Sequence, residues 1–399
     1  MKKTIKRTIV TPINAVQLLL LKTSYHFFKL VKLEKISWVV GTDEVAGVLR
    51  GAAKALPNSC SVNLSIPKLR NSSYDYTIRV GRGYEFRRLL IGPLMLGYLA
   101  NRSEQFYYIW NRGFLLNRSS EFRFLKRHSA RLAIMFCGDD IRSPLLHRQM
   151  CNDLGRDTFV NYGFYLDPPG GAEEYEKLQL ATAREAEMYG DVIFNAPVCQ
   201  SSYLTDDSDK LVYSHGFISI DDDQFCYNIA KFDDEIITIV HAPTSMAIKG
   251  TPFVREAINR LRQERSDFVY LELQNTSHHE VIEKLHSAHI CLNQFFSFGT
   301  GVLGVEAMAS RCATLMSADP NIEPSIPLPD SGATPWMITQ SQDIYDNVKL
   351  LLNDRLKLKK IADEGFEYAL ENYSLTSSSK RLRDSLIRHG FEIKDPLHE

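Results

Sequence analysis

In the first half of the chain, short runs of β-branched or aromatic residues alternate with longer stretches whose apolar residues recur at helical spacing. Residues 36–40 form one such run, and the apolar positions between 44 and 56 follow the spacing of a helix. The same pattern predicts strands at 61–66, 76–80, 106–110, 132–136 and 191–195 and helices at 85–100 and 173–188. Alternating strands and helices indicate a parallel sheet covered by helices on both faces.

The second half of the chain repeats this alternation more clearly. Its pattern predicts strands at 235–240, 268–273, 289–292 and 313–316, helices at 251–264, 279–287 and 302–310, and three further helices at 341–353, 356–373 and 377–389. We therefore predict an α/β fold of two Rossmann-like domains that face a central cleft, with the C-terminal helices packing back toward the N-terminal domain. In such folds ligands bind where the carboxyl ends of the strands meet the cleft.

A segment with few apolar periodicities, 201–232, separates the two halves. We place an N-terminal domain at 34–230 and a C-terminal domain at 231–375, with an N-terminal segment at 1–33 and a final helix and tail at 376–399. A run of three aspartates at 221–223 lies in the separating segment. Such a run is typical of a solvated turn, so we predict no metal site there.

Residues 1–33 are both basic and apolar: they contain seven Lys and Arg side chains and no acid. Lys22 and Lys29 interrupt the apolar run, which argues against a signal peptide, and the run is too short to span a bilayer. One interpretation is a basic amphipathic helix that lies on an anionic membrane surface. The other is a helix packed on the protein with its lysines in solvent. The sequence leaves both open.

Composition narrows the class of protein. The chain has 399 residues, of which 44% are hydrophobic and 24% charged, and its net charge is −1. These values are ordinary for a globular protein and give no overall sign of a nucleic-acid partner. The seven cysteines are odd in number and show no CxxC spacing, so we expect reduced thiols in a cytoplasmic protein.

The stretch 293–309 places a glycine loop between a predicted strand and a predicted helix. Gly299 and Gly301 form the loop, and Glu306 falls one to two turns inside the helix. A helix N-terminus after such a loop offers backbone N–H groups and a positive dipole end to a phosphate. The carboxylate of Glu306 is suited to bind two vicinal hydroxyl groups, as on a ribose. The plainer interpretation is two turn glycines and a surface carboxylate.

The stretch 241–251, which reads His-Ala-Pro-Thr-Ser-Met-Ala-Ile-Lys-Gly-Thr, follows the first predicted strand of the second half. Lys249 sits at the start of the next predicted helix, where a cation is otherwise unfavourable. A lysine there makes better sense facing a diphosphate. The alternative is a surface lysine beside the turn residue Gly250.

Taken together, these motifs resemble a known family. The 241–251 stretch, the run Ala-His-Ile-Cys-Leu-Asn-Gln at 288–294, the glycine loop and the run Glu-Ala-Met-Ala at 306–309 resemble the C-terminal half of the family 4-type (group 1) retaining glycosyltransferases of the GT-B architecture, in their bacterial surface-polysaccharide branch. The resemblance covers 235–375 and includes Glu-Asn-Tyr-Ser at 371–374. The N-terminal half is similar more loosely, through 39–47 and through Phe-Cys-Gly-Asp-Asp-Ile-Arg at 136–142, where a bacterial branch often reads His-Gly-Ser-Asp-Ile-Arg.

The resemblance implies a role for individual residues. Lys249 would bind the donor diphosphate, and Glu306, which matches the second Glu of the family's E-x7-E motif, would bind the ribose hydroxyls. The residues placed on the donor side are Lys249, Gly250, Gln294, Gly299, Thr300, Gly301, Glu306 and His241. Those placed on the acceptor side are Gly41, Gly47, Asp139, Asp140 and Arg142, and those expected in catalysis are Lys249, Asp140 and Glu306.

The chain departs from the family pattern at three places. Phe298 stands where the first Glu of E-x7-E is expected, and Gln294 is a candidate to take over some of its work. Cys137 stands where many members have a histidine, and the phosphate-binding arginine has no counterpart within 241–248.

Three groups of polar residues also have a plainer interpretation. Asp139, Asp140 and Arg142 are equally typical of a helix N-cap with an ion pair. The basic run Arg79, Arg82, Arg87 and Arg88 is suited to a lipid-linked pyrophosphate or to the membrane, or else forms a solvated helix face. His215 lies near the domain junction, as a cleft residue or as a loop histidine.

The family resemblance implies the transfer of a sugar from a UDP- or GDP-linked donor to a glycan or lipid-linked glycan, with retention of configuration. It places this reaction in the synthesis of lipopolysaccharide or capsule, without a metal cofactor. The nucleotide sugar is the expected partner, and the protein is expected in the cytoplasm, peripherally on the inner face of the membrane. The departures keep two alternatives open: a catalytically degenerate GT-B scaffold and a nucleotide-sugar epimerase on the same fold.

Overall fold

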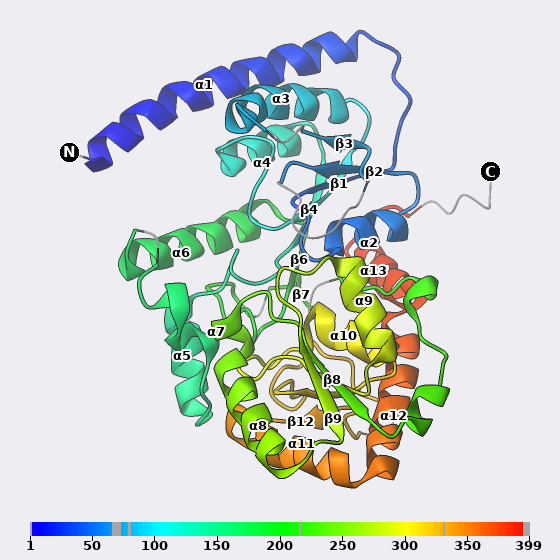
Figure 1. The fold of residues 1–399 in the computed structure, drawn as a ribbon. Helices are drawn as coiled ribbons and strands as arrows, with labels where there is room; N and C mark the ends of the chain where they lie inside the picture. The colour runs from blue at the N-terminus through cyan, green and yellow to red at the C-terminus, as the bar shows by residue number, and fades with distance from the viewer. Residues whose placement is uncertain are drawn as a thin grey trace.

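The computed structural model describes residues 2–65, 73–78, 81–168, 170–206, 208–214, 217–329 and 332–393, with residues 2–11 and 164 described by their backbone alone. Two domains, each built on a parallel sheet flanked by helices, lie one above the other (Figure 1). This arrangement confirms the predicted α/β fold class.

The N-terminal domain holds the larger sheet. Its seven strands run parallel in the order β3-β2-β1-β4-β5-β6-β7. The strands are β1 (Trp38–Thr42), β2 (Ser59–Asn63), β3 (Tyr76–Thr77), β4 (Gln105–Ile109), β5 (Arg131–Met135), β6 (Val192–Asn195) and β7 (Leu211–Tyr213). The helices are α2 (Val48–Ala55), α3 (Tyr84–Leu99), α4 (Arg118–Arg127), α5 (Pro144–Asp153) and α6 (Ala172–Tyr189). The strand order reverses between β1 and β4, which is where such sheets open a crevice.

The C-terminal domain holds a five-stranded parallel sheet in the order β12-β11-β10-β8-β9. Its strands are β8 (Ile237–His241), β9 (Phe268–Glu272), β10 (Ile290–Leu292), β11 (Ala313–Met316) and β12 (Met337–Ile338). Its helices are α7 (Met246–Lys249), α8 (Thr251–Glu264), α9 (His278–Ser287), α10 (Gly301–Ala309), α11 (Ile344–Asn353) and α12 (Arg355–Tyr373). The order reverses between β8 and β10, so the loops after these two strands meet at one point of the sheet edge.

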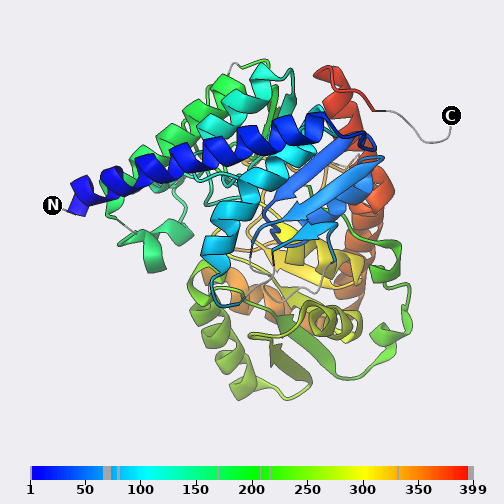
Figure 2. The same ribbon diagram turned by 90° about the horizontal axis from the view of Figure 1, so that it is seen from above.

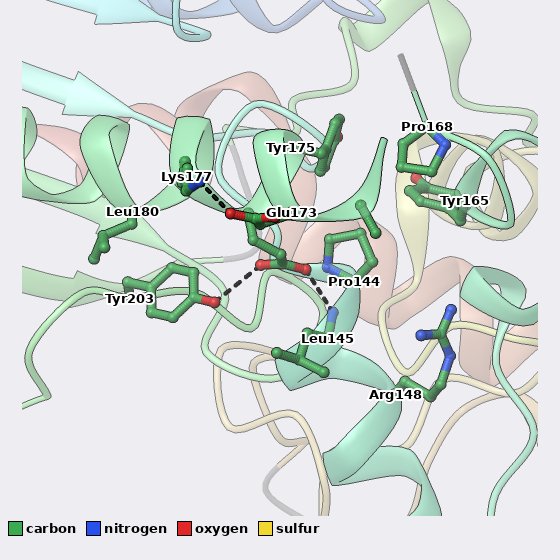
Figure 3. Close-up of a pocket in the computed structure, with 12 residues that line it drawn as sticks. Pro144, Leu145, Arg148, Tyr165, Pro168, Glu173, Tyr175, Lys177, Leu180 and Tyr203 are labelled. Carbon is green, nitrogen blue, oxygen red and sulfur yellow. Dashed lines mark hydrogen bonds and ion pairs between the residues drawn. The ribbon is translucent and has the colours of Figure 1, made fainter. Parts of the chain in front are cut away.

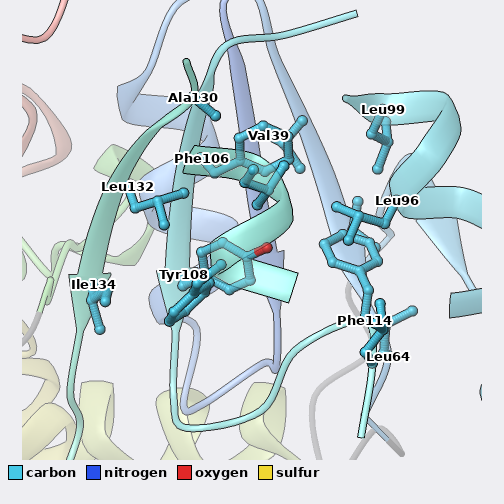
Figure 4. Packing of buried hydrophobic residues seen from close by; sticks show 14 of the residues in the cluster. Val39, Leu64, Leu96, Leu99, Phe106, Tyr108, Phe114, Ala130, Leu132 and Ile134 are labelled. Carbon is cyan, nitrogen blue, oxygen red and sulfur yellow. The ribbon is translucent and has the colours of Figure 1, made fainter. Parts of the chain in front are cut away.

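The cores explain the strand pattern. All five residues of β1 and of β4 are buried, as expected for strands covered on both faces. On one face of the larger sheet, Val39, Phe106 and Tyr108 pack against Leu96 of α3 (Figure 4). Tyr108 donates a hydrogen bond to the fully buried Glu121, so this buried carboxyl group has a partner.

The last helix, α13 (Leu375–Arg388), leaves the C-terminal domain and packs on α2 (Figure 1). Leu382 and Leu386 join the hydrophobic cluster beneath α2, and Arg383 Nε donates to Ala55 O at 2.6 Å. This confirms the prediction that the C-terminal helices pack back toward the N-terminal domain.

Helix α1 (Lys2–Lys29) lies across α3 as the outermost layer of the N-terminal domain (Figure 2). None of the helices in the described ranges is long and apolar enough to cross a membrane.

Within the described ranges, five α-helices and strands were not predicted from the sequence: α4, α5, α7, β7 and β12. Strand β7 lies inside the segment 201–232 that we expected to separate the domains. The last strand of the first sheet thus ends at Tyr213, and the first of the second begins at Ile237. The predicted boundary at 230/231 falls between these two strands.

Candidate functional site

The glycine loop is held by two buried amide side chains. Asn293 Nδ2 donates to Thr300 O at 2.7 Å, and Gln294 Nε2 donates to Gly299 O at 2.6 Å. Gly301 begins α10 with a φ of +61°, and an added Cβ would lie 3.4 Å from the Gln294 amide. The loop therefore delivers the first turn of α10, where a helix directs its backbone N–H groups outward, to the edge of the sheet.

Lys249 comes from the neighbouring loop and reaches the same place. Its Nζ donates to Gln294 Oε1 at 2.6 Å, which joins the loop after β8 to the glycine loop after β10. Burial lowers the pKa of Lys249 to about 8, and the Glu306 carboxylate acts in the opposite direction. Lys249 ends the short helix α7 and precedes α8 by two residues, rather than starting a helix as predicted. Gly250, with φ at +74°, makes the turn between them.

Glu306 lies in the middle of α10 with only 5% of its surface exposed. Its Oε1 is 2.7 Å from Nε2 of His278, the first residue of α9. The structure thus gathers a cation, a helix N-terminus and a carboxylate beside one another, as a nucleoside diphosphate requires. The sequence analysis missed His278 because its pairing with Glu306 joins two different helices.

The ring of His241 makes its hydrogen bonds within the C-terminal domain. Its Nδ1 lies 2.6 Å from Leu292 O and its Nε2 lies 2.9 Å from Thr251 Oγ1, and the side chain is fully buried. Burial lowers its pKa to about 4, so the ring is neutral, with Nδ1–H donating and Nε2 accepting from the hydroxyl group. Both ring nitrogens are used within the protein, so His241 supports the loop that carries Lys249 and leaves no nitrogen for a donor.

Phe298, the residue in place of the first family glutamate, faces the other domain. It is 5% exposed and packs with Cys151, Ala196 and Cys199 of the N-terminal domain. Phe296, two residues earlier, stacks on Tyr162 with ring centroids 5.1 Å apart. The segment between β10 and α10, which includes the glycine loop, therefore also forms part of the seam between the domains.

A buried carboxylate closes this seam. Glu323, which follows β11, is fully buried and accepts hydrogen bonds from the backbone N–H groups of Val198 and Cys199 at 3.1 and 2.7 Å. Its other oxygen accepts from Ser325. The carboxylate thus satisfies two N–H groups of the N-terminal domain from the C-terminal one.

On the acceptor side, Asp140 is occupied by its own loop. Its carboxylate accepts from the backbone N–H groups of Cys137 at 3.1 Å and Gly138 at 2.7 Å, and 1% of the residue is exposed. Burial raises the pKa of Asp140 to about 7 against these hydrogen bonds. Its role here is to shape the turn after β5.

Asp139 and Arg142 form the ion pair that the plainer interpretation expected. Tyr165 also donates a hydrogen bond to Asp139. The N-cap of α5 is Ser143, whose Oγ accepts from Leu146 N at 3.1 Å, so the cap itself is not one of the predicted aspartates.

The remaining acceptor-side glycines lie around β1. Gly41 is inside β1, where an added Cβ would meet Val62 O at 2.8 Å. Gly47 is the N-cap of α2 with φ at +93°, and its N–H donates to Glu44 Oε1 at 2.6 Å. Both positions require glycine, one for close approach and one for its backbone angle. Arg79 and His215 lie outside the described residues.

Asp43, directly after β1, is a feature that the sequence analysis did not single out. It is 4% exposed, and neither carboxylate oxygen accepts a hydrogen bond from any residue in the described ranges. Burial raises its pKa, opposed by Arg112 at 3.9 Å and by Arg88. An unsatisfied carboxylate at the carboxyl end of a central strand is a candidate to meet a hydroxyl group of a ligand.

A hollow of about 440 Å³ lies between α5 and α6 on the N-terminal domain (Figure 3). Tyr165, Tyr175 and Tyr203 contribute rings to it, and Leu145 and Leu180 contribute apolar side chains. Tyr175 donates to Asp139 O at 3.2 Å, so the hollow adjoins the predicted acceptor side. Its residues come from three separate segments, which no local pattern in the sequence connects.

Two Rossmann-like domains joined at a seam, with a glycine loop at the switch point of the second, are the arrangement of the GT-B class of fold. No protein-family model and no curated protein matches the sequence. Among solved structures, HepE from Anabaena with UDP and glucose aligns with a TM-score of 0.55 and 9% identity, over 89% of this chain and 100% of that one. Sucrose-phosphate synthase from Thermosynechococcus elongatus aligns with a TM-score of 0.57 and 12% identity, over 89% and 98%.

A third solved structure has a different described activity. A putative UDP-N-acetylglucosamine 2-epimerase from Listeria monocytogenes aligns with a TM-score of 0.51 and 11% identity, over 92% of this chain and 99% of that one. At these identities the likeness shows the fold. The chain therefore shares the GT-B fold with glycosyltransferases and with this epimerase.

Proposed function

We propose that the protein is a glycosyltransferase that moves a sugar from a UDP- or GDP-linked donor to a glycan or lipid-linked glycan. The observation that carries the proposal is the hydrogen bond from Lys249 to Gln294, which places a partly buried cation beside the glycine loop that leads into α10. Glu306 lies further along the same helix, and we propose that its carboxylate binds the ribose hydroxyls. The UDP-bound neighbour HepE supports a nucleotide-sugar donor on this fold.

The proposed reaction breaks the bond between the anomeric carbon and the diphosphate oxygen. Negative charge then gathers on the leaving diphosphate, where Lys249 and the N–H groups of α10 stabilise it. The acceptor hydroxyl bonds to the anomeric carbon on the same face, and its proton passes to the departing phosphate oxygen. We propose retention of configuration, as the family resemblance implies, and attack on the same face without a covalent intermediate, because Phe298 supplies no carboxylate to act as a nucleophile.

In this proposal the positive charge of Lys249 and of the helix dipole stabilises the leaving diphosphate, a function that a divalent cation has in other transferases. No group of three or more His, Cys, Asp or Glu side chains within the described ranges is arranged to hold a metal ion. The proposal assigns no cofactor besides the nucleotide sugar, as the family resemblance implies.

The acceptor is proposed to enter opposite Lys249, along the ends of β1 and β5. In this proposal Gly47 makes the turn into α2, and the carboxylate of Asp43, whose oxygens accept no hydrogen bond within the described ranges, accepts one from an acceptor hydroxyl. In this proposal Asp139 and Arg142 hold the wall of the acceptor side rather than contact the sugar, because they pair with each other. We place the reaction in surface-polysaccharide synthesis, in the cytoplasm and peripherally on the inner face of the membrane.

Two alternatives have an observation in their favour. Phe298 in the domain seam favours a degenerate scaffold, because it removes a sugar-binding carboxylate. The Listeria neighbour favours an epimerase on the same fold.

Turnover of a panel of UDP- and GDP-sugars by the full chain separates these functions. Release of nucleoside diphosphate that Lys249→Ala abolishes supports the transferase. Exchange of the C2 hydrogen with deuterated water supports the epimerase. No turnover of any donor supports the scaffold and contradicts our proposal.

A further inference from the structure

Helix α1 turns polar side chains toward the protein. Gln17 and Ser24 are 2% and 4% exposed. Gln17 Nε2 donates to Leu89 O at 3.0 Å and Ser24 Oγ donates to Leu94 O at 2.6 Å, so both bind backbone carbonyls of α3. Gly97 of α3 allows this close approach, because an added Cβ would lie 2.7 Å from Ser24.

The opposite side of α1 is apolar. Val16, Leu19 and Phe27 are 52%, 65% and 61% exposed, and Leu30, just past the helix, is 89% exposed. Leu18, Leu21 and Tyr25 pack against the core, so α1 carries apolar side chains on its inner and on its outer side. The outer side of a helix packed in water is normally polar.

Helix α3 extends this apolar surface. Phe86, Leu90 and Leu94 follow at four-residue spacing and are all exposed, so they form one stripe along α3. Leu116 is also exposed and its N–H donates to Gln17 Oε1 at 3.0 Å, which places it beside α1. These exposed side chains of α1, α3 and Leu116 are named the α1–α3 surface.

Basic side chains accompany the apolar ones. Lys22 and Lys29 are exposed on α1, Lys32 follows it, and Arg82 precedes α3. Helix α1 contains no acidic residue and α3 contains one, Glu85. Exposed apolar residues together with lysines are the chemistry of a surface that meets anionic lipid.

The arrangement of the helices leaves this surface open. Both α1 and α3 lie on the side of the N-terminal domain that faces away from the C-terminal domain, with α1 outermost (Figures 1 and 2). In the views of the described chain, no other element covers the outer side of α1.

We propose that the α1–α3 surface docks on the headgroup region of an anionic phospholipid bilayer, with α1 lying in the membrane plane. Val16, Leu19 and Phe27 enter the interface, and Lys22 and Lys29 pair with anionic headgroups. Charge complementarity and the exposed apolar side chains on the outer side of α1 favour lipid over a protein partner. The docking rests on the proposed function only in that it would bring the acceptor side to a lipid-linked glycan.

Co-sedimentation of the full chain with vesicles tests the proposal. We expect binding to vesicles of phosphatidylcholine with one fifth phosphatidylglycerol, weakening as salt is raised, and little binding to phosphatidylcholine alone. The double variant Leu19→Glu and Phe27→Glu should lower the partition coefficient by roughly tenfold or more. The matched control is Leu178→Glu with Met188→Glu on α6, where both side chains are equally exposed.

The outcomes separate docking from the donor site. Unchanged melting temperature and unchanged UDP binding in the α1 variant show that the fold and the donor site are intact, whichever way the vesicles behave. Equal sedimentation of the α1 variant and wild type would overturn the proposal. A second result would also overturn the proposal: wild type is a dimer that does not bind vesicles, and the α1 variant is a monomer. The α1–α3 surface would then bind a second copy of the chain.

Discussion

Nε2 of His278 lies 2.7 Å from Oε1 of Glu306, and this pair joins the start of α9 to the middle of α10. The contact fixes the orientation of a carboxylate that is almost wholly buried. A fixed carboxylate beside a phosphate-binding helix is suited to discriminate a ribose from a deoxyribose, because only the ribose offers two vicinal hydroxyl groups.

We predict that wild type binds UDP about tenfold or more tightly than 2′-deoxy-UDP, since a lost hydrogen bond to a buried charged group costs about 1.5–3 kcal/mol. Glu306→Ala should bind the two nucleotides equally, and His278→Ala should retain part of the preference. Titration calorimetry measures both dissociation constants. Equal affinity of wild type for the two nucleotides would remove Glu306 from the ribose site.

The lowered pKa of Lys249 predicts that nucleotide binding depends on pH. Burial lowers its pKa to about 8 in the free protein, and a bound diphosphate favours the charged form and therefore raises that pKa. Affinity for UDP should be full below pH 8 and fall as pH rises above it, by up to tenfold per unit. Lys249→Arg, which stays charged, should bind with little change from pH 7 to 9.5. A wild-type profile as flat as that of the arginine variant contradicts this role.

His241 predicts a pH dependence of stability. Its pKa is about 4 when folded and near 6.5 when unfolded, so between these values the unfolded chain binds the extra proton. The stability linked to His241 is present above pH 6.5 and is lost as pH falls toward 4, by up to about 3 kcal/mol. His147, also buried with a lowered pKa, titrates in the same window.

The comparison variant for His241 is His241→Asn, which keeps a donor for Leu292 O. Its urea midpoint, relative to wild type, should be lower at pH 7 and should approach that of wild type as pH falls to 4.5. A constant difference over this range would show that His241 is protonated in the folded protein.

The apolar surroundings of Phe298 predict that replacing it with glutamate, the residue that the family pattern has there, lowers the stability of the protein. Phe298→Glu places a carboxylate among the apolar neighbours Cys151, Ala196 and Cys199, and burying this charge should destabilise the protein by about 3 kcal/mol. Phe298→Leu keeps the seam apolar and should cost about 1 kcal/mol. Thermal unfolding measures both. If Phe298→Glu were as stable as wild type and turned over the donor faster, the claim that the side chain of residue 298 packs in the seam between the domains would be contradicted.

The sequence predicted the elements whose pattern is strong. Helix α8 and strand β11 begin and end where their apolar spacing placed them, since a long amphipathic helix and a buried strand leave clear periodicities. Strand β7 was missed because three partly exposed residues at a sheet edge carry almost no pattern. Helix α5 was missed because its buried residues are few and include His147.

In the candidate site, too, features with a local sequence pattern were predicted and features that depend on tertiary contacts were not. The meeting of Lys249 with the glycine loop was foreseeable, because both follow strands that neighbour the switch point. The pairing of Glu306 with His278, the capping of Val198 and Cys199 by Glu323 and the hollow beside Tyr165 depend on tertiary neighbours that no local spacing reveals. The contact of His241 with a donor stays a prediction, against which its two internal hydrogen bonds stand.

The most direct test of a nucleotide-sugar site is a thermal-shift panel of UDP, GDP, ADP and CMP on wild type, Glu306→Ala and Lys249→Ala. The control is Glu364→Ala, which removes an exposed carboxylate on α12. A ligand that binds only the folded state raises the melting temperature by mass action. We predict that UDP or GDP stabilises wild type and the control but neither site variant. No shift of wild type with any nucleotide would contradict the donor site.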